Sequence, residues 1–174
     1  MFNIEIKAKC GNHSKIRELL KNRQAKMGEI EAQVDTYFNV KNGRLKLRQA
    51  DSVSTLIFYQ RENFPGIKPS EFLLCSVNDP KSLEILLERA LGTIIKIRKK
   101  RETYYIDNIK FNLDVVQELG NFIEIEASTN TKNDFNKLTA IVNEYLKLFE
   151  INSKDLLSHS YSDMLLMKNK KIIH

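Results

Sequence analysis

Several segments of this chain alternate charged and apolar residues with the period of a β-strand. The first is Asn3-Ile4-Glu5-Ile6-Lys7, and similar segments occur at 44–48, 110–114 and 124–126. Successive side chains of an extended strand point to opposite faces, so each segment has one polar and one apolar face. A sheet built from such strands must bury its apolar face, and it gathers carboxylates and cations on the other.

The polar face has two possible environments. In an ordinary half-buried sheet it contacts solvent. If the sheet closes on itself, the interior is shared by Glu5, Asp114, Glu124, Glu126, Lys7, Lys46 and Arg48. That closed arrangement is typical of a site for a metal and a polyanion, because carboxylate oxygens bind hard divalent cations and clustered cations bind phosphate oxygens.

The turn residues and apolar periodicities predict a strand-rich, mostly antiparallel α+β protein. Seven or eight strands are expected, with candidates at 3–9, 29–39, 44–49, 54–61, 70–77, 94–106, 109–116 and 122–128. Helical spacing and capping residues predict helices at 13–25, 80–91 and 133–149. Closure removes the edges of such a sheet, so we expect a closed or nearly closed eight-stranded antiparallel β-barrel with a charged lumen and helices packed outside.

Length and charge narrow the class of protein. With 174 residues and 42% hydrophobic content, the chain is expected to form one domain, 1–167, followed by a basic tail at 168–174. The net charge of +6 favours an anionic partner. No basic-then-apolar leader and no run of about 18 apolar residues is present, so we expect a cytoplasmic protein, monomer or homodimer, with no membrane contact. Cys10 and Cys75 lack metal-ligand spacing.

A basic run at 96–101 needs separate interpretation. Alternation places Lys96, Arg98 and Lys100 on one face and Lys99 and Arg101 on the other, so one set alone can face a lumen. The run could also bind nucleic acid, together with the basic tail. Carboxylates on the neighbouring strands would repel a phosphate backbone, so we expect no nucleic-acid partner.

The motifs follow an order that resembles the CYTH superfamily, the triphosphate tunnel enzymes that include class IV adenylyl cyclases, thiamine triphosphatases and inorganic triphosphatases. The opening Asn3-x-Glu5-x-Lys7 is similar to the ExExK signature of that family. The further matching segments are Gln33-x-Asp35-x-Tyr37-Phe38, Leu45-Lys46-Leu47-Arg48, Lys99-x-Arg101, Leu113-Asp114-x-Val116, Leu119-Gly120-x-Phe122, Glu124-x-Glu126 and Ser160-Tyr161-Ser162-Asp163-Met164-Leu165. Each motif is weak alone, but their order along nearly the whole chain is specific.

This resemblance implies roles for individual residues. Glu5, Glu124 and Glu126 would bind Mg²⁺ or Mn²⁺. The phosphates would be held by Lys7, Lys46, Arg48, Lys99 and Arg101. The catalytic set would be Glu5, Lys7, Asp114 and Glu124, with Asp114 near the metal or orienting the basic residues.

The implied activity is hydrolysis of an organic or inorganic small-molecule triphosphate, with two alternatives. One is a class IV adenylyl cyclase that converts ATP to cAMP and pyrophosphate, and the other is a non-catalytic protein that binds polyphosphate or a nucleotide. The sequence departs from the family pattern at three positions, two of which, Asn3 and Gln60, motivate the second alternative. Asn3 replaces the first carboxylate, Gln60 stands where many members have a lysine, and Glu71 stands where a basic residue is expected.

Overall fold

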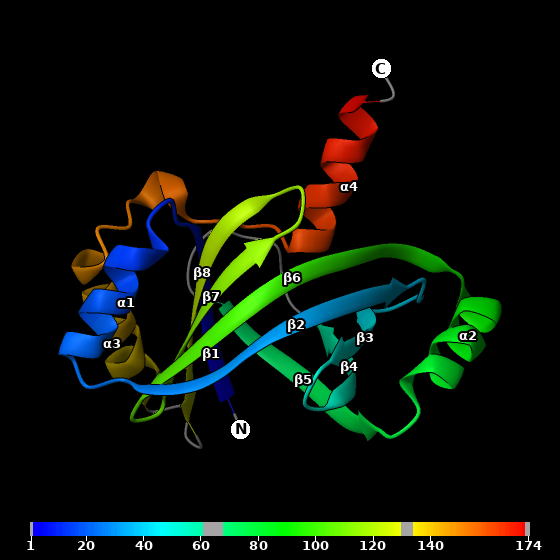
Figure 1. Ribbon diagram of the computed structural model, residues 1–174, viewed down its shortest axis with the longest axis horizontal. Helices are drawn as coiled ribbons and strands as arrows, with labels where there is room; N and C mark the ends of the chain where they lie inside the picture. Colours follow the sequence, from blue (N-terminus) through cyan, green and yellow to red (C-terminus); the bar gives the residue numbers. More distant parts are fainter. Residues whose placement is uncertain (1, 61–67, 130–133, 173–174) are drawn as a thin grey trace.

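The structure is a computed structural model that describes residues 2–60, 68–129 and 134–172. Eight strands form one sheet (Figure 1). They are β1 (Phe2–Lys9), β2 (Lys26–Phe38), β3 (Arg44–Ala50), β4 (Ser54–Gln60), β5 (Lys68–Val77), β6 (Thr93–Ile106), β7 (Ile109–Val116) and β8 (Gly120–Thr129). Every strand expected from the sequence is confirmed, with ends that differ by up to three residues.

The sheet closes into the expected antiparallel barrel, in the order β1-β5-β4-β3-β2-β6-β7-β8. β1 pairs with β8 over eight residue pairs but with β5 over three, from Asn3↔Ser70 to Glu5↔Lys68. The sheet is therefore strongly curled and its closing seam is short. The expected hairpin at Asn42-Gly43 joins β2 to β3, and Gly43 has a φ of +66°, a conformation that favours glycine.

Four helices and one short 3₁₀ helix lie in the described residues. They are α1 (His13–Asn22), α2 (Pro80–Leu91), α3 (Phe135–Leu148), η2 (Ser153–Asp155) and α4 (Tyr161–Ile172). The first three confirm the sequence prediction. α4 was not predicted as a helix, although Ser160 and Asp163 cap its start: the Asp163 amide donates to Ser160 Oγ at 3.2 Å and the Ser160 amide to Asp163 Oδ2 at 3.0 Å. α4 also extends beyond residue 167, where the sequence analysis placed the start of the tail.

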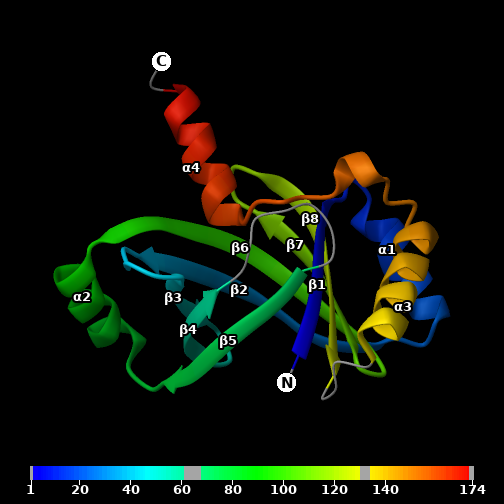
Figure 2. The ribbon, with the colours of Figure 1, turned by 180° about the vertical axis from the view of Figure 1, so that it is seen from behind.

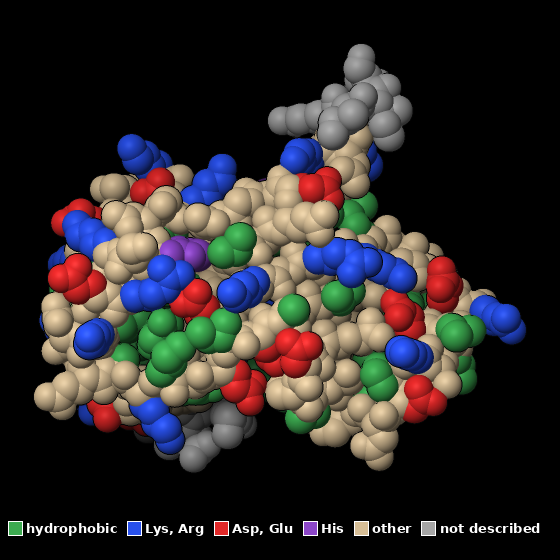
Figure 3. Space-filling view, viewed as in Figure 1, with side chains coloured by type: hydrophobic (Ala, Val, Ile, Leu, Met, Phe, Trp, Pro, Cys, Tyr) green, Lys and Arg blue, Asp and Glu red, His purple; other side chains and the backbone are tan. Residues whose placement is uncertain are grey.

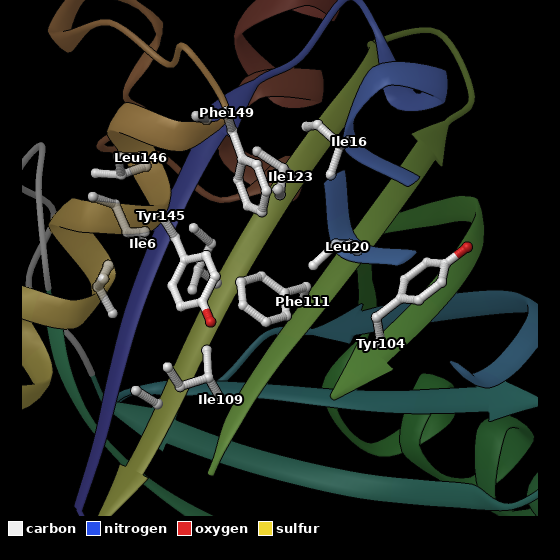
Figure 4. Packing of buried hydrophobic residues seen from close by; sticks show 14 of the residues in the cluster. Ile6, Ile16, Leu20, Tyr104, Ile109, Phe111, Ile123, Tyr145, Leu146 and Phe149 are labelled. Atoms are coloured by element: carbon white, nitrogen blue, oxygen red, sulfur yellow. The ribbon is translucent and has the colours of Figure 1, made fainter. Parts of the chain in front are cut away.

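The main hydrophobic core lies outside the barrel, between the outer face of the sheet and helices α1 and α3 (Figure 4). Ile4, Ile6 and Ala8 of β1 point into this core, while the intervening residues point to the lumen. The Phe111 ring makes an edge-to-face contact with Tyr145, with centroids 4.7 Å apart. The apolar half of the alternating strands β1, β7 and β8 is thus buried under helices, and the polar half is directed inward.

α4 projects away from the sheet, and its first turn lies near β6, as Figures 1 and 2 show from opposite directions. Its first residue, Tyr161, packs with Ile97, Val116 and Phe122 in a second apolar cluster. The start of the helix thereby contributes the Tyr161 side chain to the lumen. None of the helices in residues 2–60, 68–129 and 134–172 is long and apolar enough to cross a membrane.

Candidate functional site

The lumen contains a cavity of about 330 Å³. Its charged lining residues come from six strands, and all of them lie at the inward positions of the alternating segments. They are Glu5, Lys7, Asp35, Lys46, Arg48, Lys99, Arg101, Lys110, Glu124 and Glu126.

The first group of charges surrounds Glu124 on β8. Lys7 Nζ lies 2.5 Å from Glu124 Oε1, and Arg101 pairs with the other oxygen of the same carboxylate. Arg101 also binds Asp114 in a bidentate manner, at 2.7 and 2.6 Å. Burial would raise the pKa of Glu124, but Lys7, Arg101 and Lys99 outweigh it and hold that pKa well below its ordinary value. Glu124 is therefore an anion in a network that spans β1, β6, β7 and β8.

The second group surrounds Asp35 on β2. Arg48 donates to its two oxygens at 2.8 and 2.9 Å, and Lys46 Nζ donates at 3.0 Å. Lys99 Nζ adds a third cation at 3.3 Å. Burial would raise the pKa of Asp35, but these three cations hold it well below the ordinary value. One buried carboxylate thus holds three of the predicted phosphate-binding side chains together.

Lys99 has an unusual electrostatic environment among these cations. Burial, followed by repulsion from Arg101 and Arg48, lowers the pKa of Lys99 to about 7, although Asp35 opposes the shift. The charge of Lys99 therefore depends on whether an anion occupies the cavity. A bound anion would favour the protonated form, so its binding near neutral pH would be coupled to proton uptake.

Tyr161 of α4 adds a neutral side chain to the charged lining. Its hydroxyl donates to Asp114 Oδ2 at 2.8 Å, and Lys7 Nζ lies 4.0 Å from the ring centroid. Burial together with Asp114 and Glu124 raises the pKa of Tyr161 well above its ordinary value, so the hydroxyl remains a donor. α4 thus fixes the position of a buried carboxylate inside the barrel.

The carboxylates of β1 and β8 have the chemistry to hold a divalent cation. Glu5 and Glu126 are direct cross-strand partners, and both side chains line the cavity. Lys7 Nζ lies 3.9 Å from Glu5, Lys110 Nζ lies 3.9 Å from Glu126, and Asn112 donates to Glu126 at 2.7 Å, so a bound cation would share these oxygens with the lysine and amide donors. In the described residues, no three His, Cys, Asp or Glu side chains form a metal cage of their own. The donor set suits Mg²⁺ or Mn²⁺ held by one or two carboxylates, water and substrate phosphates.

The structure brings the sequence-predicted site residues together. Glu5, Lys7, Lys46, Arg48, Lys99, Arg101, Glu124 and Glu126 line the one cavity. Asp114 is fully buried behind it, against Arg101 and Tyr161. Lys96, Arg98 and Lys100 are on the outer face of β6, where Figure 3 shows a group of Lys and Arg side chains.

Two of the three departures from the family pattern, Asn3 and Glu71, have side chains outside the described residues. The third, Gln60, is exposed and does not line the cavity, and Tyr59 beside it does. Gln60 is therefore not the inward residue of β4.

Asp35 and Tyr161 belong to the site but had no role assigned from the sequence. Asp35 lies on the same face of β2 as Gln33 and Tyr37, because alternate residues of a strand share a face, and this pattern could have identified it. Its contact with Lys99 depends on β2 pairing with β6, a neighbour more than 50 residues away in sequence. Tyr161 enters the lumen from a helix, so strand alternation gives no information about it.

Comparisons with known proteins agree with this architecture. The family described as CYTH domain matches residues 1–161. A protein from Methanocaldococcus jannaschii, named "putative adenylate cyclase", is 27% identical over 173 residues, covering 94% of this chain and 98% of its own.

Two solved structures have the same fold. A Pyrococcus horikoshii protein superimposes with a TM-score of 0.79 at 23% identity, covering 92% of this chain and 98% of its own. A Hippeastrum protein, described as a "putative adenylyl cyclase" with a dominant triphosphatase activity, superimposes with a TM-score of 0.66 at 15% identity, covering 97% and 96%. The match over residues 1–161 shows that this chain belongs to the CYTH domain family.

Proposed function

We propose that this protein is a metal-dependent phosphohydrolase that acts on a triphosphate bound in the barrel. The observation that carries the proposal is the clustering of cations from β1, β3 and β6 in a cavity that also contains the carboxylates of β1 and β8. A triphosphate needs cations at its oxygens, and phosphoryl transfer needs the developing charge neutralised. An ordinary solvated face would not bury such a set.

The roles follow from the contacts. The phosphate oxygens would be contacted by Lys46, Arg48 and Lys99. These side chains would replace some of their hydrogen bonds to Asp35 with contacts to the substrate. Because these side chains are already held in place, they lose little freedom when the substrate binds. Arg101 and Lys7, held by Glu124, would contact the phosphates nearer β8.

Glu5 and Glu126 would hold Mg²⁺ or Mn²⁺, with Glu124 beside them. The metal, when bound, supplies charge neutralisation at the phosphate oxygens and an oriented water. Asp114 and Tyr161 would act as positioning residues, because Asp114 fixes the guanidinium of Arg101 and Tyr161 donates to Asp114.

Product analysis tests the reaction. The purified chain is incubated with Mg²⁺ or Mn²⁺ and, separately, ATP, thiamine triphosphate and tripolyphosphate. Orthophosphate release is the expected result. Pyrophosphate with cAMP from ATP would instead support cyclisation, the second candidate, which the name of the archaeal relative favours. Binding without any product would support a non-catalytic role.

A variant tests the residue assignment. Glu124→Gln removes the charge that faces Lys7 and Arg101, and metal-dependent turnover should fall to background. Glu88→Gln, on the exposed side of α2, is the matched control and should retain full activity. Because Glu124 is buried, circular dichroism must show that the variant is folded. If it is not, Lys46→Gln replaces it, with an expected loss of roughly 100-fold. Unchanged turnover in a folded variant would contradict the assignment.

A further inference from the structure

One side of the cavity differs chemically from the rest. Ile57 and Tyr59 of β4 line it together with Phe72 and Leu74 of β5. These four residues form two cross-strand pairs, Ile57↔Leu74 and Tyr59↔Phe72, so they make one continuous surface, called here the apolar wall. Among the described residues of β4 and β5, no charged side chain lines the cavity.

Two side chains of the apolar wall, Phe72 and Leu74, line the cavity and remain partly exposed. Phe72 is 37% exposed and Leu74 is 60% exposed, whereas the charged residues of the opposite walls are largely buried. Apolar side chains that remain accessible inside a cavity are typical of ligand sites, since covering them with a ligand is favourable. An inorganic triphosphate has no apolar surface and would leave this wall in contact with water.

The wall lies next to the phosphate-binding cations. Lys46 Nζ is 5.8 Å from the ring centroid of Tyr59 and 5.5 Å from that of Tyr37. The same Nζ is 3.0 Å from Asp35. One ligand can therefore contact Lys46 with a phosphate and reach Tyr59 with an adjoining group.

We propose that the substrate is an organic triphosphate, whose planar organic group packs on the apolar wall while its phosphates lie against β3 and β6. This inference rests on the proposed function and specifies its substrate class. Tyr59 and Phe72 provide ring faces for a flat heterocycle, and Ile57 and Leu74 provide aliphatic surface. These four residues then determine specificity, and the cations bind the part that all triphosphates share.

Equilibrium binding of ATP, thiamine triphosphate and tripolyphosphate tests the inference. Calorimetry in the presence of EDTA measures binding in the absence of divalent metal. The variants are Phe72→Ala and Leu74→Ala. Each should weaken binding of at least one organic triphosphate about tenfold, with tripolyphosphate changed by less than about twofold. Leu73→Ala is the matched control, because Leu73 lies between them on β5, is 70% exposed and does not line the cavity.

A gain-of-charge variant gives a second readout. Leu74→Lys places a cation on the wall, and it should strengthen tripolyphosphate binding while weakening the organic triphosphate. The inference is overturned if the wall variants change the binding of organic triphosphates and of tripolyphosphate equally. It is also overturned if they leave the binding of organic triphosphates unchanged while tripolyphosphate still binds. Both results leave the proposed function intact. Binding with the expected selectivity but no turnover with metal would overturn the proposed function alone. If the wild-type protein binds neither ATP, thiamine triphosphate nor tripolyphosphate, both the inference and the proposed function are wrong.

Discussion

Replacing Asp35 with Asn removes the carboxylate that accepts hydrogen bonds from Arg48, Lys46 and Lys99. Asp35 is 2% exposed, and each of these cations donates to it within 3.3 Å. Removing one partner of a buried ion pair costs about 3–5 kcal/mol, because the remaining charge is left uncompensated. At about 2–4 °C per kcal/mol for a chain of this size, the melting temperature should fall by roughly 6–20 °C.

The cost should depend on pH. Asp35 opposes the lowering of the pKa of Lys99, which is about 7 in the intact protein. Without Asp35, Lys99 loses its proton more readily, and this removes part of the repulsion. The destabilisation by Asp35→Asn should therefore be larger at pH 6 than at pH 8.

Binding of a polyanion should reverse the destabilisation caused by Asp35→Asn. In the variant, tripolyphosphate finds the cations without a competing carboxylate, so its stabilisation at a fixed concentration should exceed that in the wild-type protein. Urea unfolding in chloride buffer free of phosphate, with and without tripolyphosphate, measures both effects. Glu150→Gln is the control, because its pair with Lys15 lies at the surface and should contribute about 0–1 kcal/mol. A variant within about 1 kcal/mol of wild type that gains nothing extra from tripolyphosphate would refute the reasoning.

Two further predictions concern Lys99 and Tyr161. Because the pKa of Lys99 is lowered to about 7 in the folded state, the unfolded chain binds more protons from about pH 7 to about pH 10, and this residue makes stability rise with pH over that range. Urea unfolding across this range should show that the free energy of unfolding rises less with pH in Lys99→Met than in the wild-type protein, whereas Lys100→Met keeps the wild-type rise. Identical pH profiles of the two variants would contradict the lowered pKa of Lys99. Tyr161→Phe removes a donor to Asp114 and should lower the free energy of unfolding by about 1–2 kcal/mol. Tyr105→Phe, at an exposed position of β6, should change it by less than about 0.5 kcal/mol, and an equally small effect at Tyr161 would argue against the hydrogen bond.

Much of the site could be predicted because alternation alone separates inward from outward residues. Alternation put Glu5 and Lys7 on one face of β1 and divided the basic run of β6 into two sets, and the family resemblance selected Lys99 and Arg101, which line the cavity. A closed sheet then brings these residues together whatever the exact strand order, which explains why the carboxylates and cations meet as expected.

The rest depends on information that a local pattern does not contain. The three cations around Asp35 come from β3 and β6, and β6 lies beside β2 because of the strand order of the barrel. Tyr161 reaches the lumen because the start of α4 packs on Ile97, Val116 and Phe122, which is a matter of helix packing. Gln60, which the resemblance placed at a family lysine position, is exposed, whereas its neighbour Tyr59 lines the cavity, and a shift of one residue in a strand reverses the face.

The apolar wall and the charged walls occupy separate parts of the sequence. β4 and β5 are consecutive strands within residues 54–77, and β5 joins β1 through a short seam of three residue pairs. Recombination between related genes could therefore exchange this single hairpin while retaining the network of Asp35, Asp114 and Glu124. In evolutionary terms, a barrel of this kind can change the molecule it accepts and inherit its phosphate chemistry unaltered.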